Sequence, residues 1–312
     1  MNVFPPLAVV VALAAPAAYP LAVSSARAPG AGAFMLAVVR RDGVLIPFAG
    51  FDGKRWNRSW PPPGLDLQVP INLTSVPKRW WGPMPPLSNW EMQTADGAHT
   101  IHVTQPDWVD VHCQRQVALR TDYVSDLPAP PPRVQPYPKD GLAVSPPRAV
   151  QAIEVIAPGR ASIYLSGLRE AFNDSELELD RNLGHPMSRR LREALEPTVE
   201  ALYAFGEHPR VYYVEASRMY RKLGDTGCTA IAFGTGWFTR DGNRFKWLDM
   251  AVDLLGCDKY GATYMLPLGA VVLDGRRFWI AQYAGWDHER YVVIEVKANR
   301  VEAVVSAQAG AC

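Results

Sequence analysis

Apolar and polar residues alternate with a period of two along much of the C-terminal half of the chain. Between residues 246 and 255 this alternation places Asp249 and Asp253 on the opposite face from Leu248, Met250, Val252 and Leu254. Comparable segments, each bounded by Gly, Asp or Asn, are predicted as strands at 211–216, 229–238, 244–255, 263–273, 276–283, 291–297 and 300–306. Short strands joined by tight turns predict an antiparallel meander, curved into a sheet or a partial barrel.

One stretch has the periodicity of a helix instead. Between residues 186 and 205, apolar side chains three and four positions apart form one stripe, made of Met187, Leu191, Leu195, Val199 and Leu202. The stripe predicts an amphipathic helix over 186–205, kinked near Glu196 because Pro197 interrupts the backbone hydrogen bonding. The fold class is therefore predicted as mainly β (α+β), with one kinked helix.

The N-terminal half is predicted to hold β-hairpins and proline-rich loops. Residues 34–56 predict a hairpin, because Asp42-Gly43 favours the positive φ of a tight turn between two apolar runs. Asp-Gly followed by Arg and then an aromatic residue recurs at 52, 241 and 274. The irregular intervals favour shared turn chemistry over the repeated blades of a propeller.

The chain is predicted to divide into four segments. A proline-rich stretch at 127–148 is interpreted as an extended connector, since proline cannot donate to a β-ladder. It separates an N-terminal β and loop region (34–126) from a C-terminal β-rich domain (149–312), and residues 1–33 form a leader.

The leader has the composition of a secretory signal peptide. Residues 7–18 are apolar and uncharged, and small residues suited to cleavage follow them. The run is shorter than the roughly 20 residues that cross a bilayer, although an uncleaved anchor or an apolar strand is the alternative. We therefore expect a secreted or periplasmic protein with no membrane span after removal of the signal.

The four cysteines agree with export. An even number of cysteines in an exported chain predicts disulfides, and four cysteines allow three pairings. Because Cys312 ends the chain, a bond from Cys257 to Cys312 would restrain the terminus and leave Cys113 to pair with Cys228. Buried free thiols are the alternative, and they would require a reducing cytosol.

Charge argues against a nucleic-acid partner. Lys and Arg total 32 against 31 for Asp and Glu, a formal net charge of +1, whereas phosphate binding favours a basic excess. No spacing of His, Cys or acidic residues predicts a metal site, and no glycine-rich fingerprint predicts a cofactor.

Three carboxylates are the candidate catalytic residues. Glu215 and Glu289 are flanked by apolar or aromatic residues, so burial could raise their pKa values and suit them to general acid catalysis. Asp249 lies on a predicted strand, about 13 Å along the chain from Asp253, so any catalytic partner must come from another strand. The alternative for each is an ion pair with a nearby Arg.

Tryptophans on loops are the second candidate feature. Trp80, Trp81 and Trp90 lie among prolines and could form a platform on which a sugar ring or an extended peptide stacks. The alternative is mutual packing of aromatics and prolines that stiffens the loops.

No motif specifies a reaction, so two functions remain. The first is a non-enzymatic extracytoplasmic protein that binds an unknown extracellular or envelope ligand. The second is a secreted hydrolase that uses carboxylates of the C-terminal sheet, with carbohydrate as the candidate substrate.

Overall fold

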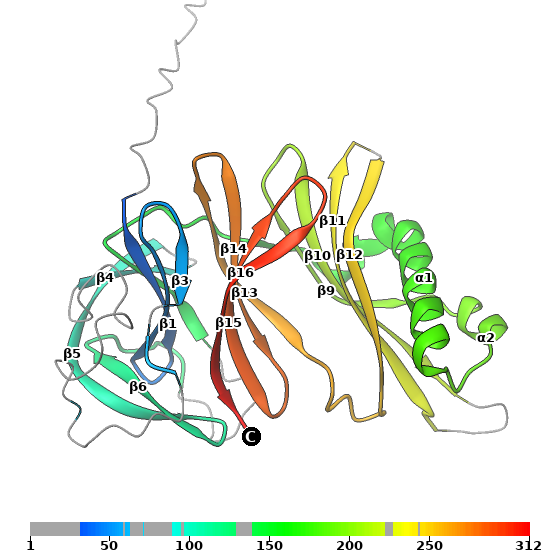
Figure 1. The fold of residues 1–312 in the computed structure, drawn as a ribbon, viewed down its shortest axis with the longest axis horizontal. Coiled ribbons are helices and arrows are strands. Elements are labelled where there is room, and N and C mark those ends of the chain that lie inside the picture. The colour runs from blue at the N-terminus through cyan, green and yellow to red at the C-terminus, as the bar shows by residue number, and fades with distance from the viewer. Residues whose placement is uncertain are drawn as a thin grey trace, which may run out of the picture.

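A computed structural model describes residues 32–58, 60–62, 71, 89–94, 97–128, 139–221, 227–242 and 244–312. The predicted signal segment at 7–18 lies outside the described residues. The prediction of a mainly β protein with antiparallel sheets and few helices is confirmed. Figure 1 shows the sheets and helices arranged in layers, which run from a small barrel to a pair of helices.

The first layer is an antiparallel barrel built from the N-terminal half. Its strands are β1 (Phe34–Arg40), β2 (Val44–Phe51), β3 (Trp56–Arg58), β4 (Asn89–Thr94), β5 (Gly97–Val111), β6 (Gln114–Thr121) and β7 (Lys139–Ser145). The strand order is β1-β7-β4-β5-β6-β2-β3, and an additional β1–β2 pairing closes the ring. The predicted hairpin is confirmed, with Gly43 at φ 73° in the turn between β1 and β2.

The second and third layers form a sandwich. The second is a sheet of four strands, β13 (Tyr264–Leu273), β14 (Arg276–Ala284), β15 (His288–Val296) and β16 (Val301–Ala311). The third is a sheet of five strands, β8 (Glu154–Val155), β9 (Thr198–Phe205), β10 (Arg210–Tyr220), β11 (Ala230–Asp241) and β12 (Arg244–Leu255). The predicted antiparallel meander is therefore present, divided between two sheets.

The fourth layer covers the outer face of the five-stranded sheet. It consists of the 3₁₀ helix η2 (Pro158–Tyr164) and the helices α1 (Leu165–Leu183) and α2 (Arg189–Glu193). Leu168 and Phe172 of α1 pack with Tyr212 and Val214 of β10. Among the described residues, no helix is both long and apolar enough to cross a membrane.

Both faces of the four-stranded sheet are buried, which explains why its strands contain long apolar runs. Phe278, Ile280 and Val293 pack against the outer surface of the barrel. There they contact a buried cluster to which β1 and β2 contribute Phe34 and Ile46. Trp279, Ala281 and Ile294, on the opposite face, pack against the five-stranded sheet.

The helix predicted over 186–205 is wrong. The structure has only five α-helical residues there, in α2, followed by strand β9 from Thr198 onward. The five stripe residues do contact one core, the cluster beneath α1, but a short helix and then a strand bring them there. Pairing of β9 with β10 outweighs local helical periodicity, and Pro197 allows the change.

Part of the predicted connector also belongs to the barrel. The stretch from Lys139 to Ser145 contains no proline, and it forms β7 between β1 and β4. Its backbone donors are therefore free to complete the ladder, although proline-rich sequence flanks it on both sides.

The presence of disulfides is confirmed, but the predicted pairing is wrong. Cys113 bonds Cys312, and Cys228 bonds Cys257. Cys228 precedes β11 and Cys257 follows β12, so the β11–β12 hairpin brings them together. Cys113 lies in the β5–β6 turn and bonds the end of β16, which joins the barrel covalently to the four-stranded sheet.

Candidate functional site between the two sheets

Four glutamates are buried in the described part of the chain, and three of them bond to a cation. The pairs are Glu176 with Arg218 at 2.8 Å, Glu289 with Lys139 at 2.9 Å and Glu295 with Arg276 at 2.7 Å. Glu215 makes no salt bridge to any described residue, although its side chain is also buried. A buried carboxylate without a cation is costly, so Glu215 is the exception to be explained.

Glu289 is held between the barrel and the four-stranded sheet. Its partner Lys139 belongs to barrel strand β7, and both side chains are at most 1% exposed. Tyr291 and Gln282 donate further hydrogen bonds to the Glu289 carboxylate. Burial lowers the pKa of Lys139, with the negative charge of Glu289 opposing that shift. Glu289 thus serves to join two layers, which is the structural interpretation of this candidate.

Glu215 lies on β10 and points into the space between the two sheets. Its Oε1 accepts a 2.6 Å hydrogen bond from the backbone N–H of Met265 on β13, and a 3.3 Å hydrogen bond from the Tyr213 hydroxyl. Burial raises the pKa of Glu215 to about 7, and the nearby Glu200 carboxylate adds to that rise. The two hydrogen bonds favour the ionised form but do not offset burial.

Tyrosines surround Glu215. Tyr213 stacks on Tyr203 with ring centroids 6.3 Å apart and meets Tyr283 edge-on at 6.4 Å. Burial raises the pKa values of Tyr203 and Tyr264 to about 12, and the negative charge of Glu215 adds to both shifts. These hydroxyls therefore stay protonated at neutral pH, while Glu215 changes charge there.

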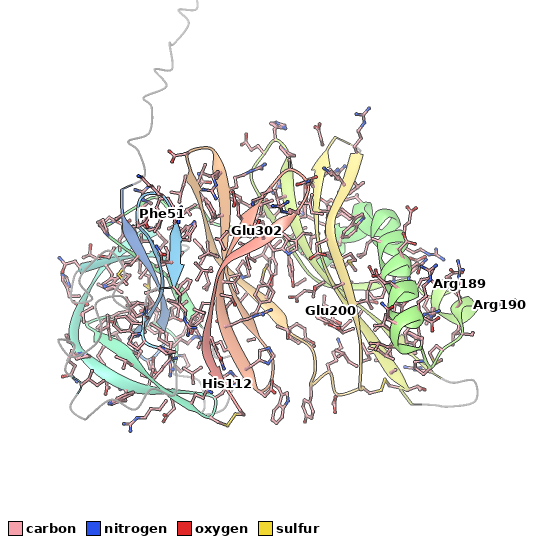
Figure 2. All side chains as sticks on the ribbon, in the orientation of Figure 1. Phe51, His112, Arg189, Arg190, Glu200 and Glu302 are labelled. Atoms are coloured by element: carbon pink, nitrogen blue, oxygen red, sulfur yellow. A yellow bond between two sulfur atoms is a disulfide. The ribbon has the colours of Figure 1, made fainter. Side chains whose placement is uncertain are left out.

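A partly exposed ion pair lies beside this group. Lys259, in the β12–β13 loop, bonds Glu200 of β9, and Ser217 donates a hydrogen bond to the same carboxylate. The side chains of Glu200 and Lys259 are 23% and 27% exposed, so this pair lies closer to solvent than Glu215. Figure 2 places Glu200 between the two sheets. We refer to Glu200, Tyr203, Glu215, Ser217, Lys259 and Tyr264 as the Glu215 cluster.

The third candidate carboxylate is separate from the other two. Asp249 is exposed, and it pairs with Trp237 across the β11–β12 ladder. A register shift at Trp237 and Phe238 places Leu248 against the core between the sheets, while Met250 packs beneath α1. The predicted common face of Leu248 and Met250 is therefore wrong, because a bulge inserts one residue. Glu215, Asp249 and Glu289 do not form one site.

The predicted tryptophan platform is not supported at Trp90. Its side chain is 1% exposed and packs inside the barrel with Met35, Met92 and Ile101. On β4 the buried Trp90 and Met92 alternate with the polar residues Asn89, Glu91 and Gln93, and this alternation favours a core position for Trp90. Trp80 and Trp81 lie outside the described residues.

Sequence reasoning found Glu215 but missed Glu200 and Lys259. Glu200 lies in the segment predicted as a helix. Strand alternation alone would place it on the face of Leu202 and Ala204, and only the register shift between β9 and β10 separates it from them. In the described ranges no three His, Cys, Asp or Glu side chains are grouped to hold a metal ion. The cluster can instead exchange a proton at Glu215 and offer hydroxyl donors to a polar ligand.

No protein-family model matches the chain, and searches of curated proteins and of solved structures find no significant match.

Proposed function

We propose that this chain is an exported, extracytoplasmic binding protein whose ligand site is the Glu215 cluster. The observation that carries the proposal is the buried Glu215 carboxyl. It forms no ion pair with any residue that the structure describes, and burial raises its pKa to about 7. Burial makes the ionised form of this carboxyl unfavourable at neutral pH, and groups with such shifted pKa values are often found at functional sites.

Two disulfides support the extracytoplasmic location. All four cysteines are bonded, and such bonds persist in oxidising compartments. Export through the predicted leader, to a secreted or periplasmic location, is part of the proposal.

The chemistry of the cluster suits an uncharged, polar ligand. Near neutral pH Glu215 is partly protonated, so it can donate or accept a hydrogen bond, and Tyr203 and Tyr264 supply hydroxyls that remain protonated. Lys259 and Glu200 neutralise each other. The cluster therefore offers several hydrogen-bonding groups with little net charge.

The test is a thermal-shift screen of the full chain at pH 6 and pH 8, with neutral monosaccharides, free amino acids and uncharged dipeptides as probes. At least one probe class should stabilise the chain, more strongly at one pH than at the other, and Glu215→Gln should remove the pH dependence of that shift. Asp249→Asn, a matched change of an exposed carboxylate on the neighbouring strands, should leave the shift unaltered. A shift that keeps its pH dependence in Glu215→Gln would exclude this site.

A hydrolase remains the second candidate, favoured by one observation. The Glu200 carboxylate is close enough to Glu215 to raise the pKa of Glu215 further, so two carboxyls of different exposure face the same space. In that arrangement Glu215 would be the general acid and Glu200 the second carboxylate. Release of nitrophenol from aryl glycosides, abolished by either Glu215→Gln or Glu200→Gln, would favour the enzyme, and its absence would favour the binding protein.

A further inference from the structure

Trp286 differs from the other tryptophans that the structure describes. Its side chain is 57% exposed, whereas the other described tryptophans are buried or half-buried: Trp56, Trp60, Trp90, Trp108, Trp237, Trp247 and Trp279. Exposing the large apolar ring of a tryptophan to water is unfavourable, so a tryptophan held at the surface needs an explanation.

Trp286 is stacked against a second exposed aromatic. The Tyr260 ring, 61% exposed, lies with its centroid 5.3 Å from that of Trp286, at an interplanar angle of 33°. Trp286 belongs to the β14–β15 turn of one sheet, and Tyr260 to the β12–β13 loop that leads from the other sheet. We call these two residues the aromatic pair.

The loop of Tyr260 is firmly held. The bond between Cys228 and Cys257 fixes the chain three residues before Tyr260, and the backbone N–H of Tyr260 donates to the Asp258 carboxylate at 3.1 Å. Lys259 adopts φ 58° and bonds Glu200, a member of the Glu215 cluster. The aromatic pair is therefore linked by one peptide unit to the cluster.

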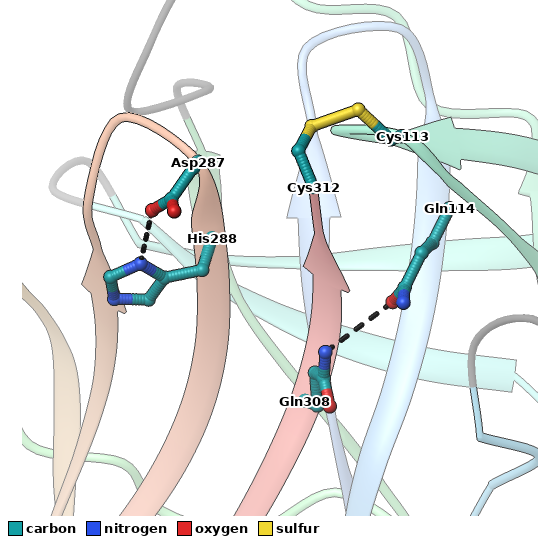
Figure 3. The surroundings of a disulfide bond; sticks show 6 residues. All are labelled: Cys113, Gln114, Asp287, His288, Gln308 and Cys312. Atoms are coloured by element: carbon teal, nitrogen blue, oxygen red, sulfur yellow. Dashed lines mark hydrogen bonds and ion pairs between the residues drawn. A yellow bond between two sulfur atoms is a disulfide. The ribbon is translucent and has the colours of Figure 1, made fainter.

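The turn of Trp286 is also held. Gly285 N–H donates to the His288 carbonyl at 3.0 Å, and the N–H of Cys312 donates to the Asp287 carbonyl at 2.7 Å. Figure 3 shows Asp287 hydrogen-bonded to His288 near β16, and Cys312, which directly follows β16, bonded to Cys113. A Cβ at position 285 would lie 2.4 Å from the His288 ring, so a larger residue there would force that ring to shift. Each disulfide thus restrains one half of the aromatic pair.

We propose that the aromatic pair is a stacking platform for a neutral oligosaccharide whose other end reaches the Glu215 cluster. Rigid aromatic faces suit the apolar C–H face of a sugar ring, and polar groups beside them suit its hydroxyls. Beside the pair, the Asp287 carboxylate is hydrogen-bonded to the His288 ring, and Glu200 forms an ion pair with Lys259. Holding the rings in place before binding reduces the entropy lost on binding.

This inference rests on the proposed function and names its ligand class, so the experiment separates the two. Isothermal titration calorimetry of the full, oxidised chain would use four tetrasaccharides as probes: β-1,4-linked glucose, N-acetylglucosamine and xylose, and α-1,4-linked glucose. At least one should bind, and Trp286→Ala and Tyr260→Ala should each weaken it about tenfold or more, from the loss of stacking and buried area. Trp286→Phe should restore part of the affinity.

Two variants serve as matched controls. Met219→Ala and Val272→Ala change side chains that are 50% and 47% exposed elsewhere on the sandwich, and both should keep wild-type affinity. Because Trp286 and Tyr260 are exposed, their variants should keep the wild-type melting temperature, which excludes misfolding as the cause of lost affinity.

Each outcome has a distinct meaning. Failure of the wild-type chain to bind any of the four probes more tightly than about 1 mM, or unchanged affinity in both alanine variants, overturns the platform. Loss of binding in Trp286→Ala together with full binding in Glu215→Gln retains the platform and overturns the proposed role of Glu215. Loss in both retains both.

Discussion

Glu289 and Glu215 occupy the two spaces on either side of the four-stranded sheet. Glu289 faces the barrel, where Lys139, Tyr291 and Gln282 all bond its carboxylate. Glu215 enters the opposite space from β10, where it receives one backbone N–H and one tyrosine hydroxyl. Both side chains are buried, so burial by itself does not distinguish them.

The difference lies in how each charge is compensated. The ion pair with Lys139 and two further hydrogen bonds compensate Glu289 and tie two layers together, whereas Glu215 has a pKa of about 7 because its burial is opposed by hydrogen bonds alone. Both glutamates have aromatic neighbours in the sequence, yet Glu289 joins two layers and Glu215 can exchange a proton. The predictions below test this contrast, from the largest expected effect to the smallest.

The largest effect should come from the covalent link on the Glu289 side. Removing the bond between Cys113 and Cys312, which are 199 residues apart, should lower the free energy of unfolding by about 5 kcal/mol on a chain-entropy basis. The same change at Cys228 and Cys257, 29 residues apart, should cost about 4 kcal/mol. Urea unfolding of the two Cys→Ser double variants measures both, and a greater loss from the shorter loop would contradict this ordering.

Lys139→Met should be the next most damaging change. It leaves Glu289 charged and buried without its cation, at a cost of about 3–5 kcal/mol. The double variant Lys139→Met/Glu289→Gln removes both charges and should recover much of that loss in the same urea titration. If the double variant is no more stable than the single variant, the cost arises from packing and not from charge.

Unlike Lys139→Met, Glu215→Gln should raise the free energy of unfolding relative to wild type at neutral and alkaline pH. The folded pKa of Glu215 is about 7 against an ordinary value of 4.5, so the folded chain binds more protons than the unfolded chain between these values. The contribution of Glu215 to the free energy of unfolding therefore falls as pH rises from about 4.5 to about 7, by roughly 3 kcal/mol in total, and stays low above that.

Parallel unfolding of wild type and Glu215→Gln from pH 4 to pH 8 checks this sign. The stability of the glutamine variant relative to wild type should increase across the range and then level off. Parallel pH profiles for the two proteins would show that Glu215 does not titrate in this window.

Asp249→Asn should have the smallest effect. Asp249 is exposed, so its replacement should change the free energy of unfolding by less than about 0.5 kcal/mol at any pH in that range. A change of the size expected for Glu215→Gln would mean that Asp249, and not Glu215, is the uncompensated carboxylate of the sandwich.

Much of the fold could be predicted from local sequence. The strands from β10 to β16 agree with the alternation of apolar residues and the positions of turn residues, as at Asp274-Gly275 between β13 and β14. The helix α1 was missed because the buried Glu176 interrupts the apolar spacing set by Leu168 and Phe172. Its charge is compensated by Arg218 of β10, a contact that no local pattern contains.

The candidate site could be predicted only in part. Aromatic neighbours correctly marked Glu215 and Glu289 as buried, but their partners Met265 and Lys139 are remote in sequence. The pairing of Cys228 with Cys257 could be predicted from the sequence, because the two cysteines flank a hairpin whose strands the alternation predicts. Trp286 lies between the predicted strands 276–283 and 291–297, which already favours a turn, but its contact with Tyr260 depends on the tertiary structure.

Sequence by itself determined that this chain is β-rich, where most C-terminal strands begin and end, and that its turns need glycine. These properties depend on backbone conformation and on periodicity over a few residues. Tertiary structure alone decided which sheet each strand joined, which cysteines met, and which carboxylate lacked a cation. Those outcomes depend on contacts between residues far apart in the chain, whose energies exceed the local preferences that a sequence displays.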